Sequence, residues 1–138
     1  MKRNNSRIKA MMVLYHYDLM NEKTDINYFN KIINEDEEVL SDEEFFDELV
    51  EGVIEHLEEI NRIINLNIKN WTLDRMSVVD RALIRIGVYE MLYTDTPKNI
   101  IINEIINLTH EYSDLGDKNA ARFNNRLLDE IRKNIDGE

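Results

Sequence analysis

The 138-residue sequence contains no cysteine, one proline and four glycines, and each of these scarcities excludes a class of structure. Without cysteine there can be no disulfide framework and no thiolate metal site. So little proline and glycine argues against a turn-rich β protein. No apolar run approaches the about 18 residues that a membrane-spanning helix needs. We therefore expect a cytoplasmic protein with no membrane segment.

The common motifs of catalysis and metal binding are also missing. The sequence has no HExxH, no Walker loop and no GxSxG. Its three histidines, His16, His56 and His110, are far apart, and none has a glutamate three residues before it, as the metal sites of helical bundles do. We therefore expect a protein that binds a partner, with no catalytic residue, no metal and no cofactor.

The charge of the chain is strongly acidic but unevenly distributed. The formal net charge is −11, yet thirteen of the acidic residues lie between Ile32 and Asn61, a block without lysine or arginine. The first ten residues hold four basic residues and no acidic one. The sequence therefore predicts a protein with one acidic surface region and one basic end. Such an uneven distribution of charge says more about binding partners than the net charge does.

Apolar residues recur at helical spacing along nearly the whole chain. In the first segment they fall at i, i+3, i+4, i+7 and i+11, which predicts one buried helix face. Similar patterns predict six or seven helices and no strand. The residues of the first face are Ile8, Met11, Met12, Tyr15 and Leu19, and further helices are expected over 26–33, 41–57, 60–68, 77–93, 101–112 and 123–135.

Several single residues mark helix ends and crossings. Ser41 with Glu44 forms a capping box, and Ser77 can cap the next apolar helix. Gly52 inside a helix costs roughly 1 kcal/mol relative to alanine, so it predicts a close helix crossing. Trp71, the only tryptophan, lies in a polar connector between apolar helices, where we expect it to help join two subdomains.

The stretch SVVDRALIRIGVYEML, residues 77–92, is apolar on almost all sides yet carries four charges. Buried charges are usually paired, so we expect Arg85 and Glu90 to be structural, with Glu104 as one candidate partner for Arg85. Asp80 and Arg81 stand in the first turn, where exposure is easy, and Asp80 also suits the helix dipole.

This stretch belongs to a longer pattern that resembles the NusB family of bacterial antitermination factors. The pattern consists of N-W-x-L-x-R, then V-D-R-x-x-L-R-x-x-x-Y-E, a D-x-P loop and I-N-E-x-x-x-L, and it appears here as NWTLDRMSVVDRALIRIGVYEMLYTDTPKNIIINEIINL. Upstream, RIKAMMVLYHYDL is similar to the first helix of the family. Downstream, RFNNRLLDEI is similar to K-F-V-N-G-V-L-D-x-I, with Arg126 in place of the glycine. The resemblance spans nearly the whole chain.

The resemblance implies an all-α, NusB-like fold of about seven helices in two packed helical subdomains, about 1–68 and 69–138. It implies a non-enzymatic, RNA-binding factor that binds boxA-type RNA of ribosomal RNA leader transcripts together with the small-subunit ribosomal protein NusE. It also implies a complex with RNA polymerase and other Nus factors. An alternative is a NusB-like module that dimerises or binds a protein and has weak RNA affinity.

Charge and the family pattern together predict the contact residues. RNA phosphates need basic groups, and unpaired bases need planar faces and amides. We expect the basic N-terminus and the start of the last helix to form one RNA surface, with the acidic block facing away. Phe123 has an alternative place in the core, as does Tyr15. The predicted RNA-binding residues are Lys2, Arg3, Arg7, Lys9, Lys118, Asn119, Arg122, Phe123 and Asn125, and the predicted partner-binding residues are Asp80, Arg81 and Tyr15.

Overall fold

The computed structural model describes residues 2–20, 41–68, 73–113 and 119–137. Within these ranges the chain forms six α-helices, one short 3₁₀ helix and no strand, which confirms the all-α prediction. The expected helix over 26–33 and Trp71 lie outside the described residues. The helices are α1 (Lys2–Met20), α3 (Glu43–Glu55), α4 (Leu57–Asn67), α5 (Val78–Tyr93), α6 (Lys98–Tyr112) and α7 (Asn119–Asp136), and the 3₁₀ helix η1 covers Leu73–Arg75.

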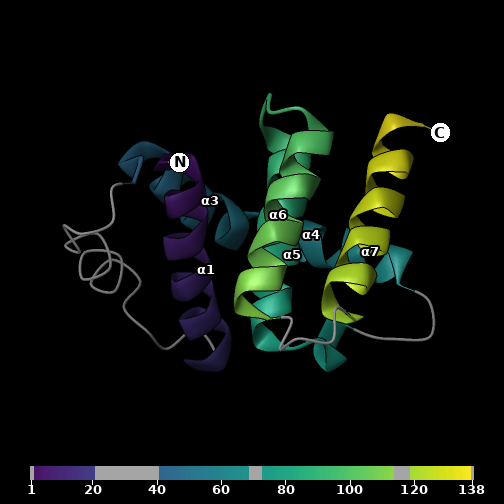
Figure 1. The fold of residues 1–138 in the computed structure, drawn as a ribbon, viewed down its shortest axis with the longest axis horizontal. Coiled ribbons are helices and arrows are strands. Elements are labelled where there is room, and N and C mark those ends of the chain that lie inside the picture. The colour runs from purple at the N-terminus through teal and green to yellow at the C-terminus, as the bar shows by residue number, and fades with distance from the viewer. Residues whose placement is uncertain (1, 21–40, 69–72, 114–118, 138) are drawn as a thin grey trace.

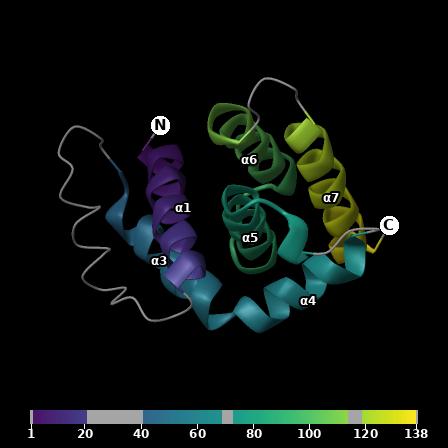
Figure 2. The ribbon, with the colours of Figure 1, turned by 90° about the horizontal axis from the view of Figure 1, so that it is seen from below.

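Helix α5 occupies the centre of the bundle. It packs against each of the other five α-helices. Helices α1 and α3 lie on one side of it, and α6 and α7 lie on the other (Figures 1 and 2). Helix α4 passes behind α5 in Figure 1 and below it in Figure 2. One apolar core therefore draws residues from both halves of the chain. The division into two subdomains stays a prediction.

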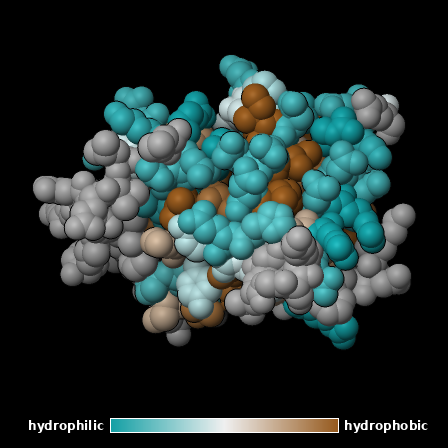
Figure 3. All heavy atoms as spheres, viewed as in Figure 1, coloured by the Kyte–Doolittle hydropathy of each residue, from teal (hydrophilic) through white to brown (hydrophobic). Residues whose placement is uncertain are grey.

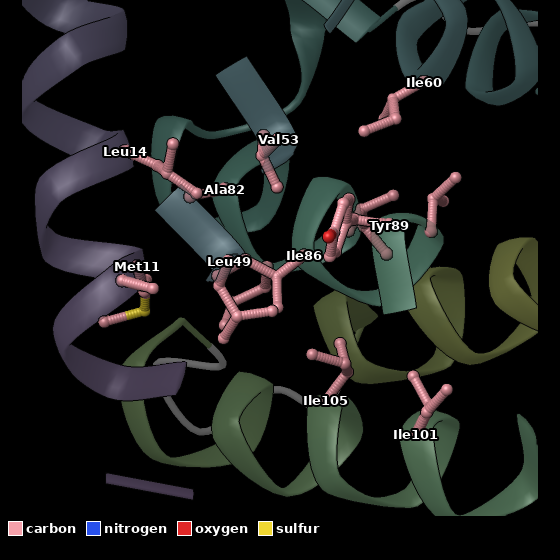
Figure 4. Close-up of a cluster of buried hydrophobic side chains, with 14 of the residues drawn as sticks. Met11, Leu14, Leu49, Val53, Ile60, Ala82, Ile86, Tyr89, Ile101 and Ile105 are labelled. Atoms are coloured by element: carbon pink, nitrogen blue, oxygen red, sulfur yellow. The ribbon is translucent and has the colours of Figure 1, made fainter. Parts of the chain in front are cut away.

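The core is made mainly of isoleucine, leucine and valine from all six helices, and Figure 4 shows part of it around Ile86. Gly52 of α3 meets Tyr89 of α5 in this region. A Cβ atom at Gly52 would overlap the end of the Tyr89 ring. The predicted close crossing at this glycine is therefore confirmed, and its cause is an aromatic side chain that lies against the backbone of α3.

Two side chains cap the helices that frame this crossing. Ser77 Oγ accepts a hydrogen bond from the backbone N–H of Asp80 at 3.1 Å, as the sequence predicted. The cap of α3 is Asp42 rather than Ser41, because the Asp42 carboxylate accepts from the N–H of Phe45 at 3.1 Å. Ser6 Oγ also accepts from the N–H of Asp42 at 2.8 Å, so the start of α3 is tied to α1.

The buried face of α1 differs from the predicted one. Met11 is buried, but Met12 is 42% exposed, Tyr15 38% and Leu19 54%. The helix instead turns Ala10, Val13 and Leu14 into the core, and Ser6 and Arg7 are buried beside them. The spacing predicted the helix correctly but not the face, because α1 has apolar residues on more than one side. One apolar face of α1 thus remains at the surface.

Candidate nucleic-acid interface

The basic N-terminal end is less available than its composition indicated. Lys2 and Arg3 are exposed, but Arg7 and Lys9 are each only 4% exposed. Arg7 donates from Nε and Nη2 to the two carboxylate oxygens of Glu90 at 2.8 and 2.7 Å. The prediction that Arg7 and Lys9 contact RNA from the surface is therefore wrong. Arg7 instead forms an ion pair with the carboxylate of Glu90, a residue that has no exposed surface.

Arg3 lies against the acidic block. Its guanidinium carbon is 3.8 Å from the centroid of the Phe45 ring, a cation–π distance. Phe45 directly follows Glu43 and Glu44 at the start of α3. The described part of the acidic block, 41–61, therefore does not face away from the N-terminal basic residues as predicted, since α3 packs along α1. Arg3 therefore lies at the first turn of α3, which carries two glutamates.

The start of α7 presents the other predicted RNA residues. Asn119, Arg122 and Asn125 are exposed, whereas Phe123 is half-buried and packs against the core. Phe123 is thus available in part to a ligand and in part to the core. Lys118 lies outside the described residues.

The two basic ends do not form one surface. Helix α1 begins at the upper end of the bundle in Figure 1, and α7 begins at the lower end on the far side of α5 and α6. Figure 2 shows the same separation. The predicted continuous surface is wrong for a geometric reason, because α1 and α7 run in opposite directions and so start at opposite ends.

A groove of about 610 Å³ runs between α6 and α7. Its described lining is mixed, with carboxamides, guanidinium groups, the imidazole of His110 and the carboxylate of Asp129 around an aliphatic floor. Asp129 is ion-paired at this groove, and the Arg132 guanidinium and then the Lys133 ammonium hold the pKa of its carboxyl below the usual range, so that it stays ionised. The lining residues are Asn99, Ile102, Asn103, Ile106, His110, Ala121, Arg122, Asn125, Asp129 and Arg132.

Asp80 is part of a buried polar junction rather than an exposed helix start. It is 9% exposed, and its carboxylate accepts from Ser77 Oγ at 2.8 Å, Ser113 Oγ at 2.7 Å and Asn124 Nδ2 at 3.0 Å. The junction joins α5 to the end of α6 and the first turns of α7. The expectation that Asp80 is accessible to a partner is therefore wrong, because donors from three elements enclose it.

Arg81 and Arg85 share one carboxylate on α1. Asp18 Oδ2 lies 3.0 Å from Arg81 Nε and 3.3 Å from Arg85 Nη1. Arg85 Nε also donates to Asn61 Oδ1 at 3.0 Å. The prediction that Arg85 is structural holds in this arrangement, but its partners are Asp18 and Asn61 rather than Glu104. Arg81 retains some exposure, with 16% of its side chain accessible.

Residues 4–133 match the model of the NusB family. The chain belongs to the NusB family. It is 38% identical to the transcription antitermination protein NusB of Bacillus subtilis (strain 168) over 141 residues, which cover 99% of this chain and 98% of that protein. NusB of Bacillus velezensis (strain DSM 23117) is 39% identical, with 99% of each chain covered.

Solved NusB structures share the fold. NusB of T. maritima superposes with a TM-score of 0.81 at 28% identity, over 96% of this chain and 92% of that one. A chain in the crystal structure of the antitermination factors NusB and NusE in complex with double-stranded RNA gives a TM-score of 0.80 at 28% identity, over 95% and 96% of the two chains. The NusB-like fold predicted from the sequence is therefore confirmed.

The relatives that the chain matches are transcription antitermination proteins. In the described part of this chain, no three histidine, aspartate or glutamate side chains gather closely enough to hold a metal ion. The helices that the structure describes also include none with the length and hydropathy to cross a bilayer.

Sequence reasoning missed Asn124, which stands where the NusB pattern K-F-V-N has valine. Asn124 has no exposed surface, and its Nδ2 contacts Asp80 and, at 3.3 Å, Thr109 Oγ1. A signal was present in the sequence, because Asn124 shares the helical period of Leu127, Leu128 and Ile131. A polar residue on that apolar face indicates a buried hydrogen bond. The groove asparagines carried no comparable signal, since α6 and α7 are brought together only by the fold.

Proposed function

We propose that this chain is an RNA-binding transcription antitermination factor that binds boxA-type RNA of ribosomal RNA leader transcripts together with NusE. The observation that carries the proposal is the match to the NusB family over residues 4–133. The superposition on a NusB chain crystallised with NusE and double-stranded RNA supports it, because the two chains are covered almost completely.

The start of α7 is the stronger candidate for the RNA contact. Arg122 and Asn125 are exposed there and supply a cation and a carboxamide, the groups that contact phosphates and base edges. Asn119 begins the same helix, and half-buried Phe123 offers a ring edge. Lys2 and Arg3 remain candidates for phosphate contacts at the other end of the bundle, where the nearby acids weaken their field.

The exposed apolar face of α1 is the candidate surface for NusE. Met12, Tyr15 and Leu19 repeat at helical spacing and are each more than a third exposed. Such a face is typical of a surface that a protein partner covers. Arg81 lies next to it through its ion pair with Asp18 and can contribute a partly exposed cation at the edge. Asp80 is left out, since it is enclosed by its own donors.

At a finer level, we propose that the complex with NusE and RNA joins the RNA polymerase elongation complex with other Nus factors. The protein acts in the cytoplasm without catalysis of its own and without a membrane. The proposal includes a homodimer of the free protein, in which a second copy covers the apolar face of α1.

The test is a binding titration with a boxA-type RNA and a scrambled RNA of the same composition, each with and without the purified NusE homologue. We expect NusE to increase the affinity for boxA RNA, and boxA RNA to bind more tightly than the scrambled RNA at moderate salt. Equal binding of the two RNAs in the presence of NusE would contradict the proposal.

A protein-only interaction module is the second candidate. It is favoured by one observation, namely that two of the four N-terminal basic residues are buried, which leaves only Lys2 and Arg3 exposed at that end of a chain of net charge −11. This alternative predicts NusE binding or self-association with the same affinity in the presence and absence of RNA. The titration above separates the two candidates directly.

A further inference from the structure

We infer that the groove between α6 and α7 binds the bases of an unpaired RNA segment. The inference rests on the proposed function and deepens it, because it places base recognition in a particular part of the molecule. The N-terminal basic end plays no part in this recognition. The groove is independent of the apolar face of α1 that the proposal gives to NusE.

The groove has the dimensions of a ligand site. Its volume of about 610 Å³ falls within the range of about 300–1,000 Å³ that small-molecule sites occupy. From Asn99 to His110 it follows eleven residues of α6, or about 16 Å at the rise of an α-helix. Because α6 and α7 are antiparallel, Arg122 stands near the His110 end and Arg132 near the Asn99 end. The groove thus admits a short strand laid along the two helices.

Three carboxamides line its length. Asn99 and Asn103 come from α6, and Asn125 comes from α7. All three are exposed, and none hydrogen-bonds to another side chain of the described residues. A carboxamide offers both a donor and an acceptor, so a row of them matches the mixed edges of bases. A charged phosphate or a purely apolar ligand would make little use of such a row.

The floor and the ends of the groove fit the rest of a nucleotide. Ile102, Ile106 and Ala121 form an aliphatic floor on which a base face can rest. Figure 3 shows hydrophobic surface between α6 and α7 among hydrophilic side chains. Arg122 supplies a guanidinium at one end, which can stack on a base or contact a phosphate. His110 adds a second planar group at that end.

The charge around the groove permits the approach of RNA. Among the described lining residues Asp129 is the only one with a carboxylate, and Arg132 and Lys133 lie 3.2 and 3.4 Å from its oxygens. The charges on α6 and α7 balance, whereas α3 and α4 together carry eight acidic residues and one arginine. A phosphate chain is therefore repelled from the α3–α4 side and not from the α6–α7 side.

An acidic peptide is the other ligand that two guanidinium groups could attract. Arg132 is already engaged, because its Nε donates to Asp129 and its Nη1 donates to Asp136. Recognition of an acidic peptide requires arginine or lysine side chains that are available to bind its carboxylates. The row of carboxamides favours bases instead.

The test pairs each groove variant with a matched variant outside the groove. Asn103→Ala and Asn107→Ala remove the same exposed side chain from the same helix, but only Asn103 lines the groove. Arg122→Gln and Arg126→Gln remove the same charge from α7, but Arg126 faces a different hollow that it shares with Phe123 and Glu130. Each variant is titrated, with NusE, against boxA RNA, scrambled RNA and a polyglutamate peptide.

We expect Asn103→Ala to weaken boxA RNA binding by about tenfold, the order of one base-edge contact, and to leave scrambled RNA and NusE binding unchanged. Asn107→Ala should behave as the wild type. Arg122→Gln should weaken boxA binding more than Arg126→Gln, although both change the net charge equally. All four side chains are exposed, so thermal unfolding should confirm that the variants fold alike.

The outcomes separate this inference from the proposed function. If the wild type prefers boxA RNA while Asn103→Ala and Asn107→Ala bind it equally, the groove does not read bases and the proposed function stands. If the wild type with NusE shows no preference for boxA RNA, the proposed function fails and the inference fails with it. Competition by polyglutamate that only the Arg122 variant abolishes would make the groove a peptide site and overturn the inference.

Discussion

Arg7 and Glu90, 83 residues apart in the chain, form a bidentate ion pair that is buried between α1 and α5. The pair explains how α5 keeps a carboxylate in its apolar interior. It also removes from the surface an arginine that charge alone would assign to RNA.

Replacement of Arg7 by alanine should destabilise the protein by about 3–5 kcal/mol, because it leaves the Glu90 carboxylate buried without a partner. Arg3→Ala, the matched control, removes an exposed cation–π contact and should cost about 0.5–1 kcal/mol. Unfolding in urea measures both. The double variant Arg7→Met with Glu90→Met should recover most of the loss, since an apolar pair of similar volume replaces a buried ion pair at little cost. Equal losses for the two alanine variants would contradict this assignment.

Replacement of Asp18 should lower the free energy of unfolding more than replacement of either arginine with which it forms an ion pair. Asp18→Ala leaves two largely buried guanidinium groups without their shared carboxylate, whereas Arg81→Ala or Arg85→Ala leaves one pair intact. A double-mutant cycle between Asp18 and Arg81 should give a coupling energy of about 0.5–3 kcal/mol. Denaturant unfolding of the four proteins of the cycle measures it. A coupling near zero would mean that the contact contributes nothing to the fold.

Asp80→Ala should destabilise the junction of α5, α6 and α7, because Ser113 and Asn124 lose their acceptor. Each buried donor left unsatisfied costs about 1–3 kcal/mol. The control is Asp95→Ala, which removes an exposed carboxylate from the loop before α6. Chemical unfolding should separate the two variants clearly. Should Asp80→Ala unfold like the control while NusE binding falls, Asp80 would act at the partner surface after all.

Stability at high pH should depend on Tyr89. Burial, followed by its 3.1 Å hydrogen bond to Glu48, raises the pKa of this phenol to about 12 from the ordinary value near 10. Below pH 10 the Tyr89 phenol is protonated in both the folded and the unfolded protein, so its full contribution to the free energy of unfolding is present there. Between pH 10 and 12 the Tyr89 phenol loses its proton in the unfolded chain but keeps it in the folded protein, so this contribution to stability is progressively lost.

The free energy of unfolding of the wild type should therefore fall more steeply between pH 10 and 12 than that of Tyr89→Phe. Spectrophotometric titration of tyrosinate should show one tyrosine near pH 12 that is missing in the variant. Parallel curves for the two proteins over this range would mean that Tyr89 ionises as it does in the unfolded chain.

The helices could be predicted from the sequence because each carries an apolar period of its own, and local signals such as Ser77 set their ends. Which of two apolar faces is buried could not be predicted for α1. Met12 and Leu19 are as apolar as Val13 and Leu14, and only the positions of α3 and α5 decide which pair enters the core.

The candidate site shows the same limit for charged residues. A basic residue near the N-terminus can bind an RNA phosphate or pair with a buried carboxylate. Arg7 was predicted to bind RNA from its charge alone, because its partner Glu90 is distant in sequence. Asp80 fits a helix start by local rules, yet its burial depends on Ser113 and Asn124. The family pattern located Arg122 and Asn125, but the groove beside them arises from the pairing of α6 with α7.

The central position of α5 has a consequence for the order in which the protein can fold during synthesis. Its last residue, Tyr93, is made about forty residues after the end of α3, a delay of roughly 2–8 s at 5–20 residues per second. Until then α1 and α3 can pair with each other, but Leu14, Leu49 and Val53 lack the side chains of α5 that cover them. Ribosome-bound chains that stop before α5 should be cut by protease within α1 and α3. Chains that extend past α7, with the whole of it outside the ribosome, should resist.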